Sequence, residues 1–170
     1  MKKIFLLQFL VATMYLPPNT PIVELRGKYM LSTQHRLQYT QSGRQHVQRP
    51  GPFVFFYRLP RDGTEVCVDT RTYGNDARFV RRSCKPNAEV KHCIEKGTLH
   101  LYIVTTCAIE KNAEITIKHE QHDLLLSPNP SSPAMPVVCA CNNPRECQIT
   151  NAASQLNRRG SNGALVENAE

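Results

Sequence analysis

Several features that would place this sequence in a common functional class are missing from it. The 170-residue chain carries a formal net charge of +7, yet it has no Lys/Arg block dense enough to form a DNA-binding arm. Its longest apolar run, within residues 4–16, is too short to span a bilayer in the usual way. No internal repeat is present, and no segment has the pattern of a long amphipathic helix. Hydrophobic residues nevertheless make up 41% of the chain, which is typical of a folded domain.

The cysteines also lack the pattern of a secreted disulfide scaffold. There are seven of them, and an odd number fits a closed disulfide framework poorly. Cys139, Cys141 and Cys147 lie within nine residues, a spacing that favours a metal site. Zinc takes four tetrahedral ligands, so these three thiolates would need a fourth ligand from elsewhere in the chain. The alternative is three free or disulfide-forming cysteines in a flexible tail.

The first sixteen residues form an apolar segment with two interpretations. Lys2 and Lys3 precede the apolar run, which imitates a secretory signal peptide. No small-x-small cleavage site follows, because the next residues are Tyr15, Leu16 and two prolines. We therefore expect residues 1–16 to contain a buried strand at an atypical start of the domain.

Short β-prone runs separated by turn residues predict a mainly β (α+β) domain. The polar residues 32–51 predict a loop or an irregular insert. Three cysteines fall in or beside the predicted strands and are expected in the core: Cys67, Cys93 and Cys107. The predicted strands are residues 22–25, 53–57, 66–69, 88–94, 98–106 and 114–117, with turns at 61–63 and 96–97.

Composition changes near the C-terminus. Residues 124–136 contain four prolines and predict an extended linker, and residues 151–170, rich in Asn, Ala, Ser and Gly, predict a disordered tail. The expected organisation is therefore an apolar segment, a domain, the linker, a cysteine cluster and the tail: residues 1–16, 17–123, 124–136, 137–150 and 151–170.

The most informative stretch is GNDARFVRRSCKPN, residues 74–87. Taken alone, it predicts a polar loop that is too irregular for the interior of a strand. Its four cations suggest a docking surface for phosphate or an acidic protein loop, including weak nucleic-acid contact, although a merely solvated face is an equally valid interpretation. These cations are Arg78, Arg81, Arg82 and Lys85.

Residues 74–87 resemble the R-F-x-N-H-S-C-x-P-N signature of SET-domain protein lysine methyltransferases. Three further segments match that family in the right order. PNTPIVELRG (residues 18–27) resembles its early P-x-x-x-I-x-E-x-x-G strand, EITI (114–117) the strand before its catalytic tyrosine, and CACNNPREC (139–147) its post-SET zinc motif. The resemblance implies a SET fold, in which small β-sheets surround a C-terminal pseudoknot and a post-SET zinc loop follows.

The chain is most similar to a divergent SET branch, the mixed-lineage-leukaemia-five and SET-domain-containing-five group. This resemblance implies a nuclear chromatin regulator with doubtful methyltransferase activity. It also implies protein partners in chromatin or histone-associated complexes, such as histone deacetylase complexes, and no membrane association. The resemblance names Cys84 as the fourth zinc ligand, beside Cys139, Cys141 and Cys147.

Three departures from the family pattern bear on the cofactor S-adenosylmethionine. Arg81 and Arg82 stand where the family has the Asn-His pair that helps to seat the cofactor, and repulsion between these cations and the cationic sulfonium is expected. No G-x-G precedes the early strand. No tyrosine follows Tyr102, and His119 lies near the catalytic position. We therefore assign no catalytic residue, and we doubt cofactor binding at Arg81 and Arg82.

Three functions remain open at this point. The first is a pseudoenzyme, a SET module that regulates transcription through protein partners. The second is an active S-adenosylmethionine-dependent histone-lysine methyltransferase with an unusual site. The third is a secreted, cysteine-containing β protein.

Overall fold

The computed structural model describes residues 8–41, 53–120, 138–143 and 145–149. The predicted linker (124–136) and tail (151–170) lie outside the described residues, as do residues 42–52 of the polar insert. Within the described ranges, no helix is both long and apolar enough to cross a membrane.

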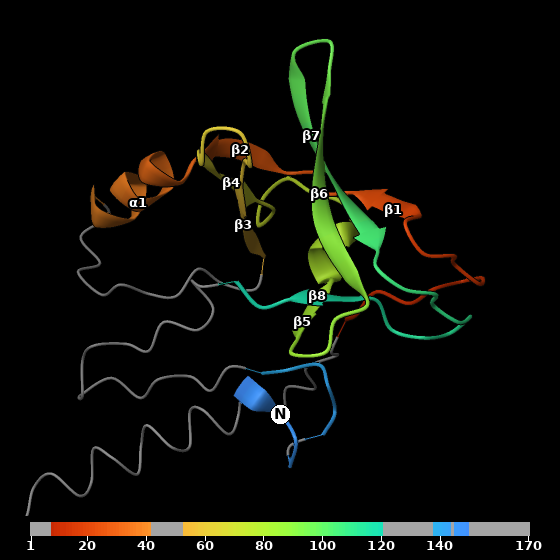
Figure 1. Ribbon diagram of the computed structural model, residues 1–170. Helices are drawn as coiled ribbons and strands as arrows, with labels where there is room; N and C mark the ends of the chain where they lie inside the picture. The colour runs from red at the N-terminus through yellow and green to blue at the C-terminus, as the bar shows by residue number, and fades with distance from the viewer. Residues whose placement is uncertain (1–7, 42–52, 121–137, 144, 150–170) are drawn as a thin grey trace, which may run out of the picture.

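The described residues form three small β-sheets (Figure 1). One has the strand order β1-β7-β6, the second has the order β2-β4-β3, and in the third β5 and β8 pair in parallel. A helix, α1, follows β2, and a short 3-10 helix, η1, precedes β5. The bounds are β1 Pro21–Glu24, β2 Lys28–Leu31, α1 Ser32–Gln41, β3 Val54–Arg58, β4 Glu65–Asp69, η1 Asp76–Phe79, β5 Arg81–Ser83, β6 Ala88–Glu95, β7 Thr98–Thr105 and β8 Thr116–Lys118.

The predicted mainly β fold is confirmed, and the strands on either side of both predicted turns, 61–63 and 96–97, pair as hairpins. β3 and β4 pair antiparallel, and Gly63 in the connecting turn has a φ of 72°. β6 and β7 pair along their whole length, and Lys96 and Gly97 form the two-residue turn between them with φ values of 48° and 80°. Positive φ at both central residues matches the twist of hairpin strands, which is why the turn residues could be recognised from the sequence.

Three expectations about local structure were wrong. Residues 32–41, expected in a loop, form α1, which carries no apolar stripe and so gives no helical period. Within residues 74–87, also expected in a loop, η1 and β5 form because β5 pairs with the distant β8. Cys67 is buried as expected, but Cys93 and Cys107 are exposed.

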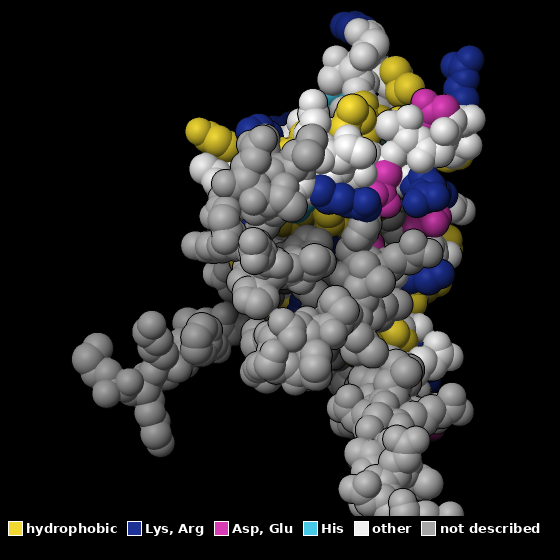
Figure 2. All heavy atoms as spheres, turned by 90° about the vertical axis from the view of Figure 1, so that its left-hand side faces the viewer, with side chains coloured by type: hydrophobic (Ala, Val, Ile, Leu, Met, Phe, Trp, Pro, Cys, Tyr) yellow, Lys and Arg dark blue, Asp and Glu magenta, His cyan; other side chains and the backbone are white. Residues whose placement is uncertain are grey.

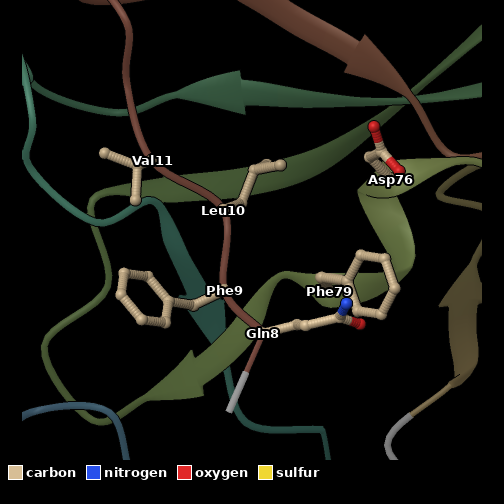
Figure 3. Close-up of a pocket in the computed structure, with 6 residues that line it drawn as sticks. All are labelled: Gln8, Phe9, Leu10, Val11, Asp76 and Phe79. Atoms are coloured by element: carbon tan, nitrogen blue, oxygen red, sulfur yellow. The ribbon is translucent and has the colours of Figure 1, made fainter. Parts of the chain in front are cut away.

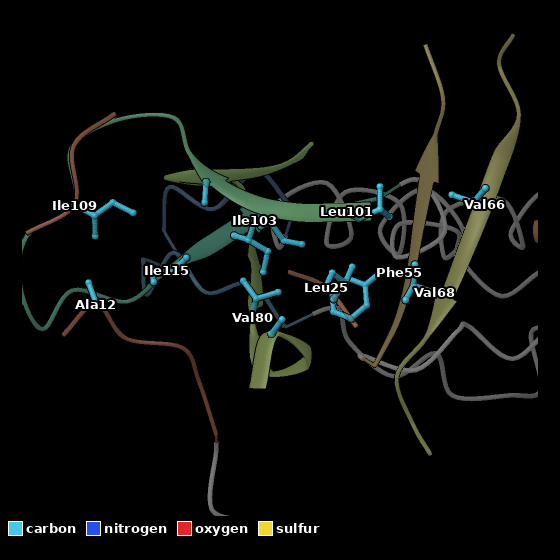
Figure 4. Packing of buried hydrophobic residues seen from close by; sticks show 13 residues of the cluster. Ala12, Leu25, Phe55, Val66, Val68, Val80, Leu101, Ile103, Ile109 and Ile115 are labelled. Carbon is cyan, nitrogen blue, oxygen red and sulfur yellow. The ribbon is translucent and has the colours of Figure 1, made fainter. Parts of the chain in front are cut away.

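One apolar core joins the sheets (Figure 4). Leu25, Phe55 and Leu101 are among its largest fully buried side chains. The N-terminal segment contributes Ala12, whose backbone N–H donates to the Ala113 carbonyl at 3.0 Å. Residues 8–16 thus run along residues 109–115 through isolated bridges and backbone hydrogen bonds, and residues 1–7 of the expected strand segment lie outside the described residues.

Candidate functional site

The parallel pair β5–β8 positions the two adjacent arginines. Arg81 lies opposite Thr116 and Arg82 opposite Ile117. Successive side chains of a strand point to opposite faces, so one guanidinium can turn inward while the other stays near the surface. Arg82 is the inward one and is 7% exposed, whereas Arg81 is half-buried.

Arg81 forms a two-pronged ion pair with Glu114. Its Nε and Nη2 donate to the two carboxylate oxygens at 2.5 and 2.6 Å. This hydrogen-bonded carboxylate raises the pKa of Arg81 further above its ordinary value, so the guanidinium is always charged. Its Cζ also lies 5.6 Å from the centre of the Phe9 ring. The Arg81 side chain therefore links β5 to the residues just before β8 and to the N-terminal segment.

Arg82 makes an internal link of the same kind. Its Nη2 donates to the Val54 carbonyl at 2.9 Å and lies 3.4 Å from Oε1 of Glu120. Its Cζ lies 4.7 Å from the centre of the Phe55 ring. The other oxygen of Glu120 accepts a hydrogen bond from the backbone N–H of Phe56 at 2.9 Å. Arg82 and Glu120 thus tie β3, β5 and the segment after β8 together.

The prediction that four neighbouring cations form one exposed docking surface is wrong. Arg82 is buried, and Arg81 is held by Glu114. Lys85 is exposed and pairs with Glu146 at 3.3 Å, while the Arg78 guanidinium lies over the Phe79 ring at 4.8 Å. On the face shown in Figure 2, Lys and Arg side chains are interspersed with acidic and apolar ones.

A hollow of about 450 Å³ lies between the N-terminal segment and η1 (Figure 3). It is lined by Gln8, Phe9, Leu10, Val11, Asp76 and Phe79. Phe9 is both a lining residue of this hollow and the residue whose ring lies beneath the Arg81 guanidinium. His119, near the expected catalytic position, is buried one residue after β8.

The four predicted metal ligands lie together. Within the described residues, the sulfur atoms of Cys84, Cys139, Cys141 and Cys147 all lie within 4.8 Å of one another. Cys84 directly follows β5, and the C-terminal segment reaches it because the backbone N–H of Ala140 donates to the Arg82 carbonyl at 2.9 Å. The backbone N–H of Cys84 also donates to the sulfur of Cys139 at 3.2 Å.

This cluster has the chemistry of a tetrahedral thiolate site. Four ligands about 2.3 Å from zinc would be separated by roughly 3.8 Å, close to the observed packing. The Asn143 backbone lowers the pKa of Cys141, but desolvation and the thiols of Cys139, Cys147 and Cys84 outweigh it and raise that pKa to about 12. A cation that binds must therefore displace the proton from the Cys141 thiol.

Glu114 and Glu120 are site residues that sequence reasoning did not assign. Glu114 belongs to the recognised EITI segment, but its side chain had no proposed role. Nothing near Glu120 suggested a partner, because its contacts lie 38 and 64 residues away, at Arg82 and Phe56.

Comparisons with known proteins place the sequence in a family. The SET domain family model matches residues 8–120. "Inactive histone-lysine N-methyltransferase 2E" of Mus musculus is 47% identical over 129 residues, and its Homo sapiens counterpart is 46% identical; each match covers 71% of this chain and 7% of the relative. "Histone-lysine N-methyltransferase ash1" of Drosophila melanogaster is 31% identical over 99 residues, 58% of this chain and 4% of the relative. The chain thus spans less than a tenth of the length of these relatives.

Proposed function

This chain belongs to the SET-domain family, and we propose that it is a chromatin-associated SET module that regulates transcription through protein partners without transferring methyl groups. The observation that carries the proposal is the internal pairing of Arg81 with Glu114 and of Arg82 with Glu120. The two relatives whose printed names call them inactive support it. A nuclear location and partners in histone-associated complexes, including histone deacetylase complexes, belong to the same proposal.

The two ion pairs change the physical reason why we expect S-adenosylmethionine to bind poorly. Each guanidinium has a carboxylate beside it, so repulsion of a cationic sulfonium is weaker than the sequence alone suggested. The obstacle is the chemistry of the side chains: a guanidinium has no acceptor, and Nε and Nη2 of Arg81 and Nη2 of Arg82 already donate to protein oxygens. The residues present therefore fit S-adenosylmethionine poorly, and we propose no step through it.

Isothermal titration with S-adenosylmethionine tests this proposal. We expect no saturable heat up to about 1 mM, where binding is worth only about 4 kcal/mol. A parallel assay with labelled cofactor and histone should show no methyl transfer, while an active SET enzyme under the same conditions serves as the positive control. A micromolar dissociation constant with measurable transfer would establish the rival function, an active lysine methyltransferase.

We further propose that Cys84, Cys139, Cys141 and Cys147 hold one zinc ion. A structural zinc with four thiolate ligands is closed to substrate, so its role here would be to fasten residues 138–149 to β5. The N–H of Cys84 that points at the sulfur of Cys139 supports this, since such donors stabilise a metal-bound thiolate.

Metal analysis of the purified chain tests the zinc proposal. We expect one equivalent of zinc, a marked loss in Cys84→Ser, and no loss in Cys93→Ser, which removes an exposed cysteine outside the cluster. Chelation should increase hydrogen exchange in residues 138–149 before the sheets are affected, because apolar burial holds the core. Undiminished zinc in Cys84→Ser would identify a different fourth ligand, and an unmodified chain without zinc would remove the site.

A further inference from the structure

The hairpin β6–β7 projects beyond the other described elements (Figure 1). β6 is the edge strand of its sheet, and residues 91–95 are all exposed. No described strand pairs with its other edge. An edge of this kind presents backbone N–H and C=O groups that can pair with another strand.

The hairpin turn determines which backbone groups face outward. A two-residue turn makes its flanking residues, Glu95 and Thr98, a hydrogen-bonded pair. Hydrogen-bonded pairs alternate with non-hydrogen-bonded pairs along an antiparallel ladder. The hydrogen bond from the Thr106 N–H to the Asn87 carbonyl (3.0 Å) lies where this alternation places one. The odd-numbered residues of β6 therefore bond to β7. The backbone groups of Val90, His92 and Ile94 are directed to the free edge.

Charge selects one register for pairing this edge with an identical one. Two copies related by a two-fold axis would pair antiparallel, and an axis through Cys93 places Lys91 of each copy opposite Glu95 of the other. An axis through His92 would place Glu89 of each copy opposite Glu95 of the other. An axis through Lys91 would place the Lys91 side chains of the two copies opposite each other. Opposite charges directly across a ladder stabilise it, and like charges destabilise it.

We propose that the β6 edge is a self-association surface, through which a second copy of this chain pairs antiparallel with Cys93 at the two-fold axis. The two three-stranded sheets would then form one continuous sheet of six strands. The outward groups of His92 and Ile94 would make the hydrogen bonds between copies, and Ile94, 65% exposed, would be covered. About six residues on each side form the contact, so the dimer is weak and reversible.

Sedimentation of the full chain under reducing conditions tests the register. We expect a concentration-dependent monomer–dimer equilibrium that weakens at least roughly tenfold in Lys91→Glu and in Glu95→Lys, since either change opposes like charges twice. The double variant Lys91→Glu/Glu95→Lys should recover most of the affinity, because both pairs are complementary again. A chain that stays monomeric up to several hundred micromolar overturns the proposal, as does a double variant no better than the singles.

Disulfide trapping tests the position of the axis. The two Cys93 residues would be a non-hydrogen-bonded pair with Cα atoms about 4.5 Å apart, within disulfide range. With oxidised glutathione, two Cys93 thiols give up two protons and two electrons to form the bond, and two reduced glutathione molecules are released. We expect trapping through Cys93 to be at least tenfold faster than through Cys107, which is also exposed. Equal rates, or a crosslink only through Cys107, would place the contact elsewhere.

A backbone variant separates edge pairing from side-chain contact. Ile94→Pro removes an N–H that faces away from β7, so the hairpin should persist while association is lost. Ile94→Ala retains that N–H and is the matched control, with circular dichroism confirming the fold of both. If both variants associate equally, the free edge is not the contact.

Discussion

Replacing Arg82 with alanine should strongly destabilise the fold, and the structure gives the size of the effect. The variant loses a charged hydrogen bond of 2.9 Å to the Val54 carbonyl, worth about 1.5–3 kcal/mol. It also loses the contact with the Phe55 ring, worth about 0.5–2 kcal/mol. The 3.4 Å contact with Glu120 is too long to add much as a hydrogen bond, but without it the carboxylate loses a nearby cation. We expect a total cost of about 3–5 kcal/mol, the usual range for breaking a buried ion pair.

Urea unfolding followed by circular dichroism measures this cost. Arg26→Ala is the matched control, because Arg26 also pairs with a glutamate but its side chain is 71% exposed; it should cost less than about 1 kcal/mol. Arg82→Met/Glu120→Gln should recover much of the loss, since it removes both charges together. If Arg82→Ala costs less than about 1 kcal/mol, the guanidinium does not hold β3 and β5 together, and our account of the arginine pair fails.

Two further predictions concern the packing of a glycine and an acid-sensitive ion pair. Gly27→Ala should cost about 1–3 kcal/mol in urea unfolding, because a Cβ there would lie 2.8 Å from Val68 and 2.9 Å from the Asp69 carbonyl. Hydrogen bonding by Arg71 lowers the pKa of Asp69, so that pair contributes stability above the unfolded pKa, and this is lost as pH falls through the folded pKa. The stability difference between the unmodified chain and Arg71→Ala should thus be present at pH 7 and shrink below about pH 4; a difference that grows on acidification would contradict the assignment.

The sequence predicted those parts of the fold that depend on local patterns. The strand predicted at residues 98–106 and the turn predicted at Lys96 and Gly97 depend on local sequence, and the structure has a strand and a turn there. The family resemblance, which the comparisons confirm, supplied the overall topology. Where a strand owes its existence to a partner far along the chain, as β5 does to β8, the local sequence resembles a loop.

The sequence pointed to the cysteine cluster and the arginine pair, but not to Glu114, to Glu120 or to the contacts between these residues. Cys84 was placed beside the C-terminal cysteines through the resemblance alone, and the structure brings all four sulfurs together. The partners of Arg81 and Arg82 were not foreseen, because pairing across 33 and 38 residues depends on how the sheets meet. Exposure was equally hard to predict: Cys93 lies in a strand, but that strand is at an edge and both its faces are solvated near the turn.

The two arginines and the two glutamates have to be considered as one unit. Changing Arg81 to Asn and Arg82 to His would restore the family motif but remove the guanidinium beside Glu114 and the one beside Glu120. A partly buried carboxylate that loses a neighbouring cation is costly, so restoring the motif conflicts with the stability of the sheets around it. The same strand, β5, also carries the Arg82 carbonyl that accepts from Ala140 in the cysteine loop. The positions that would seat a cofactor in the wider family therefore serve here to fasten β3, β8 and the C-terminal segment to β5.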